Sequence, residues 1–379
     1  MPSRTTRYAA LVAVAALGLA ACSGGNNEKQ KASVGGGSAL SDCPGKVVVQ
    51  TDWFPEPEHG GLYQMIDPAT AVKDKKKGIY SGPTTADKKV TLEIRAGGPF
   101  IGFQPATALL YSQPSIMLGF INTDEQVKTS LRQPTLAVVS PLQRSPQILM
   151  WDPAKYQFAT FADIGKSDAK VLYFQGAAYM DWLVNMGWVR KNQVDSSYDG
   201  SPTRFVSGEK VAQQAFVTSE PYQYEHELKQ WMRPVSYLSI DDAGFHVYSQ
   251  PLVGKPDVIR SNAACLKQLV PQIQRGQVAY MKDPAPVNKA ITQYLKEMGQ
   301  FWQISEERGA ATVQVLKDKK IVANGPDGVL GSFDESRVAE FIALMAPLYE
   351  KQGIKVKRDL KPSDLVTNEF IDKSVSYTP

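Results

Sequence analysis

Residues 50–63 read QTDWFPEPEHGGLY, a run dense in aromatic residues, carboxylates, prolines and glycines. A short apolar stretch at 46–50 leads directly into it and predicts a β-strand. Because Pro55 and Pro57 prevent regular strand pairing, we expect a loop after that strand. Ligands of open α/β sheets bind at loops that leave the carboxyl ends of strands. The alternative is a solvated turn, but Trp53 and Phe54 are costly to leave in water, so a binding loop is favoured.

The N-terminus has the features of an export signal. Arg4 and Arg7 precede a short apolar run at 8–21, which ends in the sequence LAAC at 19–22. The apolar run is too short to be a comfortable membrane span, and it carries the small residues of a cleavage site. The LAAC sequence resembles a bacterial lipobox, a signal in which the peptide is cut before the cysteine and the cysteine then carries lipid.

We therefore expect residues 1–21 to be a lipoprotein signal peptide and Cys22 to be the lipid attachment site. An ordinary secretory peptide with an incidental cysteine is the alternative, and both interpretations predict a protein outside the cytoplasm. Residues 22–42 are rich in Gly, Ser, Asn and Lys and have few apolar side chains, which predicts a flexible tether. The chain has no second long apolar run, so we expect no transmembrane helix after the signal peptide.

Two further cysteines, Cys43 and Cys265, remain in the exported part of the chain. An oxidising compartment permits a disulfide between them, and this is the favoured interpretation. A bond that closes so long a loop contributes about 4–5 kcal/mol in the chain-entropy model. Two separate buried thiols are the alternative.

The charge balance excludes one class of partner. The chain has 42 basic and 38 acidic residues, and the signal peptide holds two of the basic ones, Arg4 and Arg7. The mature protein is therefore close to neutral, and no basic patch argues for nucleic acid. We expect the Lys-rich run at 73–77 to be a solvated surface loop.

Short apolar runs alternate with amphipathic stretches, as in α/β architecture. The predicted strands are 46–51, 90–95, 115–121, 135–140, 147–151, 170–174, 235–238 and 247–253. The predicted helices are 105–112, 124–132, 178–186, 209–218, 262–281, 284–298 and 335–352.

The helix at 335–352 has the clearest pattern, because apolar residues recur along it at helical spacing, Asp334 can cap its start and Gly353 can cap its end. This stripe predicts core. Pro271 predicts a kink, or two shorter helices, within 262–281. The polar segment at 67–89 predicts an inserted surface loop.

Sequence motifs for catalysis and metal binding are missing. The chain has neither a phosphate-binding GxxxxGK[ST] loop nor a GxSxG nucleophile elbow. Its three histidines, His59, His226 and His246, lack metal-ligand spacing and are interpreted as polar contacts. We therefore expect no metal, no cofactor and no catalytic residue, although a dispersed catalytic triad leaves the enzyme alternative open.

Four loops carry chemistry suited to binding. They lie at 50–63, 96–104, 174–179 and 217–222. Each combines aromatic and polar side chains with glycines or prolines in the backbone. In the last of them, Glu220 precedes a proline and is held in an extended conformation; a surface helix terminator is the alternative. Aromatic faces that stack a planar ring, with carboxylates and amides at its edge, would form a small-molecule pocket.

Five motifs occur in a recognisable order along the chain: DWFP at 52–55, HGGLY at 59–63, GGP at 97–99, PLQRSP at 141–146 and FVTSEPY at 216–222. The mature chain resembles the solute-binding proteins of ABC importers, in the branch for thiamine-pyrimidine precursors, riboflavin, nitrate and sulfonates. The motifs are fairly specific in combination and weak singly.

The resemblance implies a two-lobed, type II periplasmic-binding-protein-like α/β fold, with the lobes joined by two crossover strands. Lobe one would comprise residues 43–140 and 245–379, and lobe two would comprise 141–244. The residues that would face the interlobe cleft from lobe one are Asp52, Trp53, His59, Gly98 and Gln104. Those that would face it from lobe two are Phe174, Gln175, Tyr179, Glu220 and Tyr222.

The sequence departs from the family pattern at the Lys-rich run 73–77 and at Asn122, where a more regular Gly-rich turn is expected. Both departures leave the ligand open. The favoured interpretation is a monomeric, lipid-anchored binding protein that captures a thiamine-pyrimidine-like compound or another planar N-heterocycle and delivers it to a membrane permease. The alternatives are a binding protein for a small anion such as nitrate or a sulfonate, an extracytoplasmic enzyme on the same scaffold, and a sensor with an empty cleft.

Overall fold

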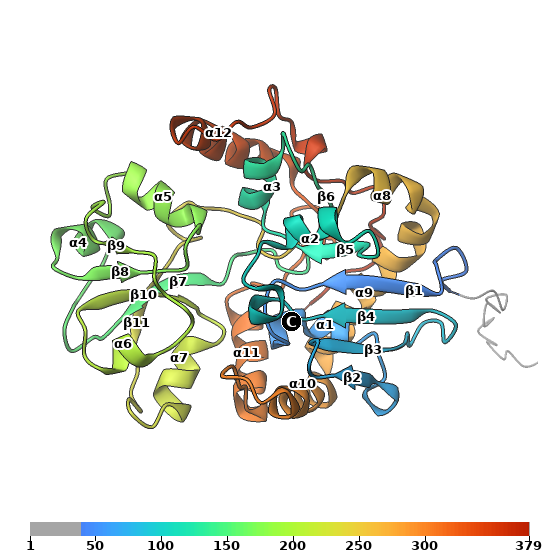
Figure 1. The fold of residues 1–379 in the computed structure, drawn as a ribbon, viewed down its shortest axis with the longest axis horizontal. Coiled ribbons are helices and arrows are strands. Elements are labelled where there is room, and N and C mark those ends of the chain that lie inside the picture. Colours follow the sequence, from blue (N-terminus) through green and yellow to red (C-terminus); the bar gives the residue numbers. More distant parts are fainter. Residues whose placement is uncertain (1–38, 379) are drawn as a thin grey trace, which may run out of the picture. The chain divides into compact units, whose positions relative to one another are not determined.

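Two mixed β-sheets with helices packed against them form the fold of the computed structural model, which describes residues 39–378 (Figure 1). The first sheet has the strand order β2-β3-β4-β1-β5-β12-β6. Its strands are β1 (Lys46–Gln50), β2 (Val72–Asp74), β3 (Ile79–Pro83), β4 (Thr91–Arg95), β5 (Leu118–Phe120), β6 (Leu136–Val139) and β12 (Leu252–Gly254). The second sheet has the order β11-β7-β10-β8-β9. Its strands are β7 (Gln147–Trp151), β8 (Lys170–Leu172), β9 (Val194–Asp195), β10 (Val211–Phe216) and β11 (Ser236–Ser239).

Parallel pairing runs through the middle of both sheets. In the first sheet β1 lies parallel to β4 and to β5, and in the second β10 lies parallel to β8, which lies parallel to β9. The carboxyl ends of neighbouring parallel strands therefore meet at one edge of each sheet. The chain passes from the first sheet to the second between β6 and β7 and returns between β11 and β12.

The helices pack around these sheets. They are α1 (Gly60–Tyr63), α2 (Ala106–Ser112), α3 (Thr123–Thr129), α4 (Phe161–Lys166), α5 (Ala178–Asn185), α6 (Thr203–Val206), α7 (Glu220–Tyr222), α8 (Pro256–Ser261), α9 (Ala263–Lys282), α10 (Ala285–Met298), α11 (Glu306–Asp318) and α12 (Glu335–Lys351). Short 3₁₀ or π turns are η1 (Pro57–His59), η2 (Pro68–Thr70), η3 (Gly98–Ile101), η4 (Gln223–Glu227) and η5 (Pro362–Asp364). None of the helices in this part of the chain is long and apolar enough to cross a membrane.

The predicted α/β fold class is confirmed, and several elements agree closely with their predictions. Strand β7 has the predicted bounds, and α12 begins after Asp334, whose side chain accepts hydrogen bonds from the first turn. The predicted stripe along α12 is buried and forms core: Val338, Phe341, Ile342, Met345 and Tyr349. The structure also contains the disulfide between Cys43 and Cys265, which ties the segment before β1 to α9.

Three predictions about secondary structure are wrong. Residues 209–218 were expected to be a helix, but they contain β10, which is sandwiched between β7 and β8 and is buried on both faces, so its apolar residues do not alternate. The segment 67–89 is not merely a surface loop, because β2 and β3 extend the first sheet. The predicted loop after β1 becomes helical at Pro57, where a proline fits the first turn of a helix.

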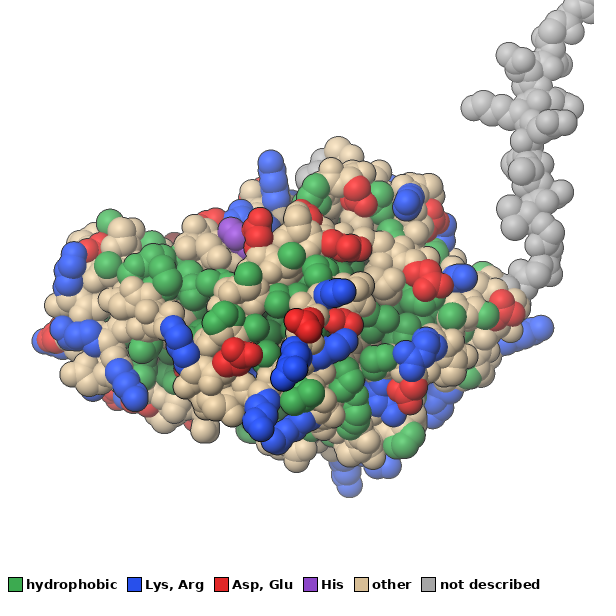
Figure 2. Space-filling view, turned by 90° about the horizontal axis from the view of Figure 1, so that it is seen from above, with side chains coloured by type: hydrophobic (Ala, Val, Ile, Leu, Met, Phe, Trp, Pro, Cys, Tyr) green, Lys and Arg blue, Asp and Glu red, His purple; other side chains and the backbone are tan. Residues whose placement is uncertain are grey.

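Two smaller differences concern α9 and β12. The interpretation of 262–281 as two shorter helices is wrong, because α9 is continuous for 20 residues through Pro271, and burial of its apolar face outweighs one missing hydrogen bond. Of the strand predicted at 247–253, the part that pairs is at its end, in β12. The predicted signal peptide, the lipidated Cys22 and most of the tether lie outside the described residues. Figure 2 shows Lys and Arg side chains interspersed with Asp and Glu on the face in view.

Candidate functional site

A cavity of about 680 Å³ lies where the strands of the two sheets end. Residues that follow β1, β4 and β5 line it from the first sheet, and residues that follow β8 and β10 line it from the second. This is the position at which α/β sheets bind ligands, and the volume suits a small organic molecule. We call this cavity the pocket.

The loop after β1 is held in place by its neighbour after β4. The backbone N–H of Gly97 donates to the Trp53 carbonyl at 2.7 Å, and that of Gly98 donates to the Asp52 carbonyl at 3.1 Å. A side chain at position 97 could not fit, because its Cβ would lie 2.3 Å from the carbonyl carbon of Asp52. Gly98 has a φ of +57° and lies against the Trp53 ring. The GGP motif therefore positions Asp52 and Trp53 at the pocket.

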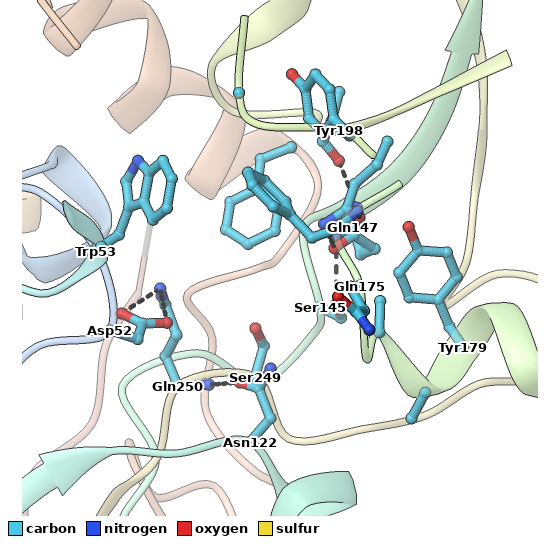
Figure 3. A pocket seen from close by; sticks show the side chains of 18 of the residues that line it. Asp52, Trp53, Asn122, Ser145, Gln147, Gln175, Tyr179, Tyr198, Ser249 and Gln250 are labelled. Atoms are coloured by element: carbon cyan, nitrogen blue, oxygen red, sulfur yellow. Dashed lines mark hydrogen bonds between the residues drawn. The ribbon is translucent and has the colours of Figure 1, made fainter. Parts of the chain in front are cut away.

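Asp52 is fixed by two donors. The side-chain amide nitrogen of Gln250 lies 3.2 and 3.0 Å from its two carboxylate oxygens (Figure 3). His59 Nε2 lies 3.1 Å from Oδ1. The same amide and the same ring nitrogen also contact Glu56 Oε1, at 3.2 and 3.3 Å. Glu56 and His59 are buried, whereas the Asp52 side chain stays 34% exposed. Asp52 thus presents an oriented carboxylate to the pocket.

Aromatic rings from both sheets meet next to this carboxylate. The Trp53 ring centroid lies 5.5 Å from that of Phe174, which follows β8, and 5.9 Å from that of Trp302. Phe174 in turn packs at 4.9 Å on Tyr198, and Phe103 lies 6.0 Å from Trp53. All five rings line the pocket, so a flat ligand can contact aromatic surface there.

A second carboxyl group reaches the pocket from the second sheet. Glu220 follows β10, is 8% exposed, and accepts a hydrogen bond from the backbone N–H of Phe216 at 2.8 Å. The extended conformation expected for Glu220 is wrong, because this residue begins the short helix α7. Burial raises the pKa of Glu220 to about 7, and the nearby charges of Arg308 and Glu58 act on it in opposite directions. The Arg308 guanidinium is itself buried, pairs with Glu227 at 3.3 Å, and does not line the pocket.

The loop after β5 supplies two more polar groups. Asn122 accepts a hydrogen bond from the backbone N–H of Gln250 at 2.8 Å, so the departure from a Gly-rich turn supports the residue that orients Asp52. Burial raises the pKa of Asp124 to about 6, and it raises that of the adjacent Glu125 to about 7. Asn122 and Asp124 both line the pocket.

Four buried polar atoms in the lining have no protein partner: Tyr179 Oη, Ser219 Oγ, Gln250 Oε1 and Trp302 Nε1. Figure 3 shows Tyr179 on the opposite side of the pocket from Asp52 and Gln250. A buried polar group without a hydrogen bond costs about 1–3 kcal/mol, so these atoms are suited to a polar ligand or to ordered water.

Eight of the ten residues predicted to face the cleft line the pocket: Asp52, Trp53, Gly98, Gln104, Phe174, Gln175, Tyr179 and Glu220. His59 lies behind Asp52, where its ring stacks on Phe120 at 4.7 Å. Tyr222 packs at 4.6 Å on the His226 ring and is not part of the lining. For these two residues the structure supports a role other than direct ligand contact.

Sequence reasoning missed several lining residues. Glu56 lies within the opening motif and could have been found there, but Gln250 and Trp302 come from distant segments without a motif. Gln250 has a φ of +55°, a backbone strain that sequence alone does not reveal.

The group formed by Asp52, Glu56 and His59 could geometrically hold a metal ion, because one ligand atom from each lies within 4.8 Å of the others. The Gln250 amide donates to both carboxylates and His59 Nε2 contacts both, so hydrogen bonds alone can hold the group together. The interpretation of His59 as a polar contact is consistent with this geometry.

The sequence matches no protein-family model, and no curated protein matches it significantly. Solved structures are similar. The alkanesulfonate-binding protein SsuA from Xanthomonas axonopodis pv. citri, bound to MOPS, is 13% identical, with a TM-score of 0.55 over 86% of this chain and 99% of that one. The aliphatic sulphonate binding protein SsuA from Escherichia coli is 11% identical, with a TM-score of 0.53 over 89% and 93%.

A zinc-bound ligand-binding component of an ABC-type import system from Staphylococcus aureus is 13% identical, with a TM-score of 0.50 over 88% and 100%. At such identities the likeness establishes the fold alone. The chain has the two-sheet α/β fold of periplasmic binding proteins, and the structures that share it include binding components of ABC importers.

Proposed function

We propose that the protein is the substrate-binding component of an ABC importer and captures a small planar metabolite, such as a thiamine-pyrimidine-like compound or another N-heterocycle. The observation that carries the proposal is the pocket at the carboxyl ends of both sheets, lined by aromatic rings and amides from each. The similar fold of binding components of ABC importers supports it.

The proposed mechanism is closure of two lobes around the ligand. We retain the lobes as residues 43–140 with 245–379, and 141–244, joined by the two connections between the sheets. A ligand that contacts Trp53 from one lobe and Phe174 from the other would favour the closed arrangement by its differential affinity. No chemical change of the ligand is proposed.

The proposed location of the protein in the cell rests on the export signal. Lipid on Cys22 would anchor it at the outer face of the cell membrane, and the tether would let it reach a membrane permease. We propose that it acts there as a monomer.

Two of the similar structures are sulfonate-binding proteins, so a small anion is the second candidate ligand. The N-terminus of α5 contributes Ala177 and Ala178 to the lining, and backbone N–H groups at a helix start suit an anion. Against this candidate, the lining of the described pocket contains no Lys or Arg, the side chains that neutralise anions.

Thermal unfolding of the mature protein with a deproteinised extract of its host tests the proposal. A ligand at a hundred times its dissociation constant should stabilise the fold by about 2.7 kcal/mol. Trp53→Ala and Glu220→Ala should each abolish this stabilisation while the proteins remain folded, and the bound compound should be recovered unchanged. Full stabilisation in both variants would show that the pocket is not the capture site, and conversion of the compound would favour the enzyme.

A further inference from the structure

The charged side chains that line the pocket are all acidic. Five carboxyl groups reach it, and no Lys, Arg or His does so among the described residues. The five are Asp52, Glu56, Asp124, Asp199 and Glu220. The buried Arg308 contacts Glu227 and stays outside the lining. Glu56 and Glu220 are buried, and burying carboxyl groups without counter-charges is unfavourable, so this arrangement favours a positive partner.

From this arrangement we infer that the ligand is an organic cation, whose positive group pairs with Asp52 beside the Trp53 ring. The inference rests on the proposed function, because it names the charge of the compound captured in the same pocket. Asp52 suits this role because it is the carboxylate of the Asp52–Glu56–His59 group whose side chain remains partly exposed.

The geometry around Asp52 is prepared in advance of binding. Gln250 donates to both of its oxygens and His59 Nε2 contacts one of them, so the carboxylate cannot turn away from the pocket. Gln250 is 2% exposed, and its Oε1 has no protein partner although it belongs to the lining. An N–H of a cationic ligand that pairs with Asp52 could also donate to this oxygen.

The aromatic rings favour an organic cation over a metal ion. Trp53 lies within ring-packing distance of Phe174 and Trp302, and the faces of such rings attract cations. A cavity of about 680 Å³ is far larger than a metal ion with its direct ligands. The Asp52–Glu56–His59 group therefore serves here as a charged support for an organic group.

The titration of the other carboxyl groups adds a pH dependence. Burial raises the pKa of Glu220, which Arg308 and Glu58 face, and that of Asp124, which Lys128 and Glu125 face. A bound cation favours the ionised form of each group, so its affinity should increase between pH 5.5 and pH 8 and binding should release protons.

Two matched series of probes test the inference by calorimetry on the mature protein. The first is 1-methylnicotinamide, nicotinamide and nicotinate; the second is 1-methylquinolinium, quinoline and quinoline-3-carboxylate. In each series the members are of similar shape and differ in charge, and the methylated cations do not titrate. We expect the cation to bind at least tenfold more tightly than its neutral and anionic partners, with an affinity that increases with pH.

Asp52→Asn should weaken cation binding at least tenfold and leave the affinity for the neutral probes unchanged. Glu350→Gln, which removes an exposed carboxylate far along α12, is the matched control and should bind like the wild type. If Asp52→Asn does not fold, Glu220→Gln and the pH series on the wild type give the same discrimination.

Neutral or anionic probes that bind as tightly as the cations would overturn the inference, as would unaltered cation binding in Asp52→Asn. Absence of binding by both cations at 10 mM would also overturn it. In that case, stabilisation by the host extract would still support the proposed function. No stabilisation by the cations or by the host extract would contradict the inference and the proposed function together. Selective stabilisation by ZnCl₂, lost in Asp52→Asn, would identify a metal site instead.

Discussion

Two carboxyl groups at the pocket have raised pKa values. Glu220 and Glu56 are buried carboxyl groups, and burial raises the pKa of both. In a protein without its ligand this arrangement lowers stability, because the folded state resists ionisation that the unfolded chain accepts readily. Binding sites commonly retain such groups at a cost to the fold.

The first prediction concerns Glu220→Gln. The folded-state pKa of Glu220 is raised from 4.5 to about 7, so its contribution to stability is present below about pH 4.5 and is lost as the pH rises towards 7. Gln cannot ionise and can still accept the hydrogen bond from the Phe216 N–H. The variant without ligand should therefore match the wild type near pH 4.5 and be about 1–3 kcal/mol more stable at pH 8.

Urea unfolding at a series of pH values measures this difference. Glu350→Gln, whose carboxylate is exposed, should show no comparable gain at pH 8. A Glu220→Gln variant that is less stable than the wild type at pH 8 would contradict the raised pKa.

Among the elements, the contact of α1 with α9 determines where the opening motif lies. Gly61 and Gly276 let the two helices approach so closely that a Cβ on Gly276 would lie 2.6 Å from the Gly61 carbonyl oxygen. A Cβ on Gly61 would lie 2.8 Å from the Cα of Gln277. The turn η1, immediately before α1, carries His59 and thereby the support of Asp52.

The second prediction is that Gly61→Ala separates α1 from α9. Overpacking of this kind costs about 1–3 kcal/mol of unfolding free energy, and the shift of η1 should also weaken ligand-dependent stabilisation. Gly45→Ala is the control, because a Cβ at Gly45 meets no atom within 4 Å. Thermal unfolding with and without host extract measures both effects; equal stability of the two variants would show that α1 has room to move.

Some of these loops and strands could be predicted from the sequence, and others could not. Loops after β1, β4, β8 and β10 were predicted to bind, because aromatic and polar residues follow recognisable strands or a Ser-Glu-Pro motif there. Gln250 and Trp302 were not predicted, since only the return of the chain to the first sheet and the packing of its C-terminal helices bring them to the pocket. Strand β10 was mistaken for a helix because a strand buried on both faces lacks alternation.

At the scale of the whole molecule, the alternation of strands and helices produces the α/β fold. The chain crosses twice between the two sheets, and these crossings determine which segments belong to each sheet. The disulfide Cys43–Cys265 closes a span of 222 residues and holds the start of the first sheet to α9. The pocket, by contrast, is a property of the assembled structure, since residues from both sheets are needed to form its aromatic and acidic lining. Under the proposed function, this pocket retains one small molecule.

Native mass spectrometry of the protein purified from its own host tests this claim most directly. We expect one small molecule bound to each wild-type chain, carrying a heteroaromatic ring, and its loss from both Trp53→Ala and Asp52→Asn but not from Glu350→Gln. A wild-type protein that carries no small molecule and gains none from the host extract would contradict the account, as would a molecule that both pocket variants retain in full.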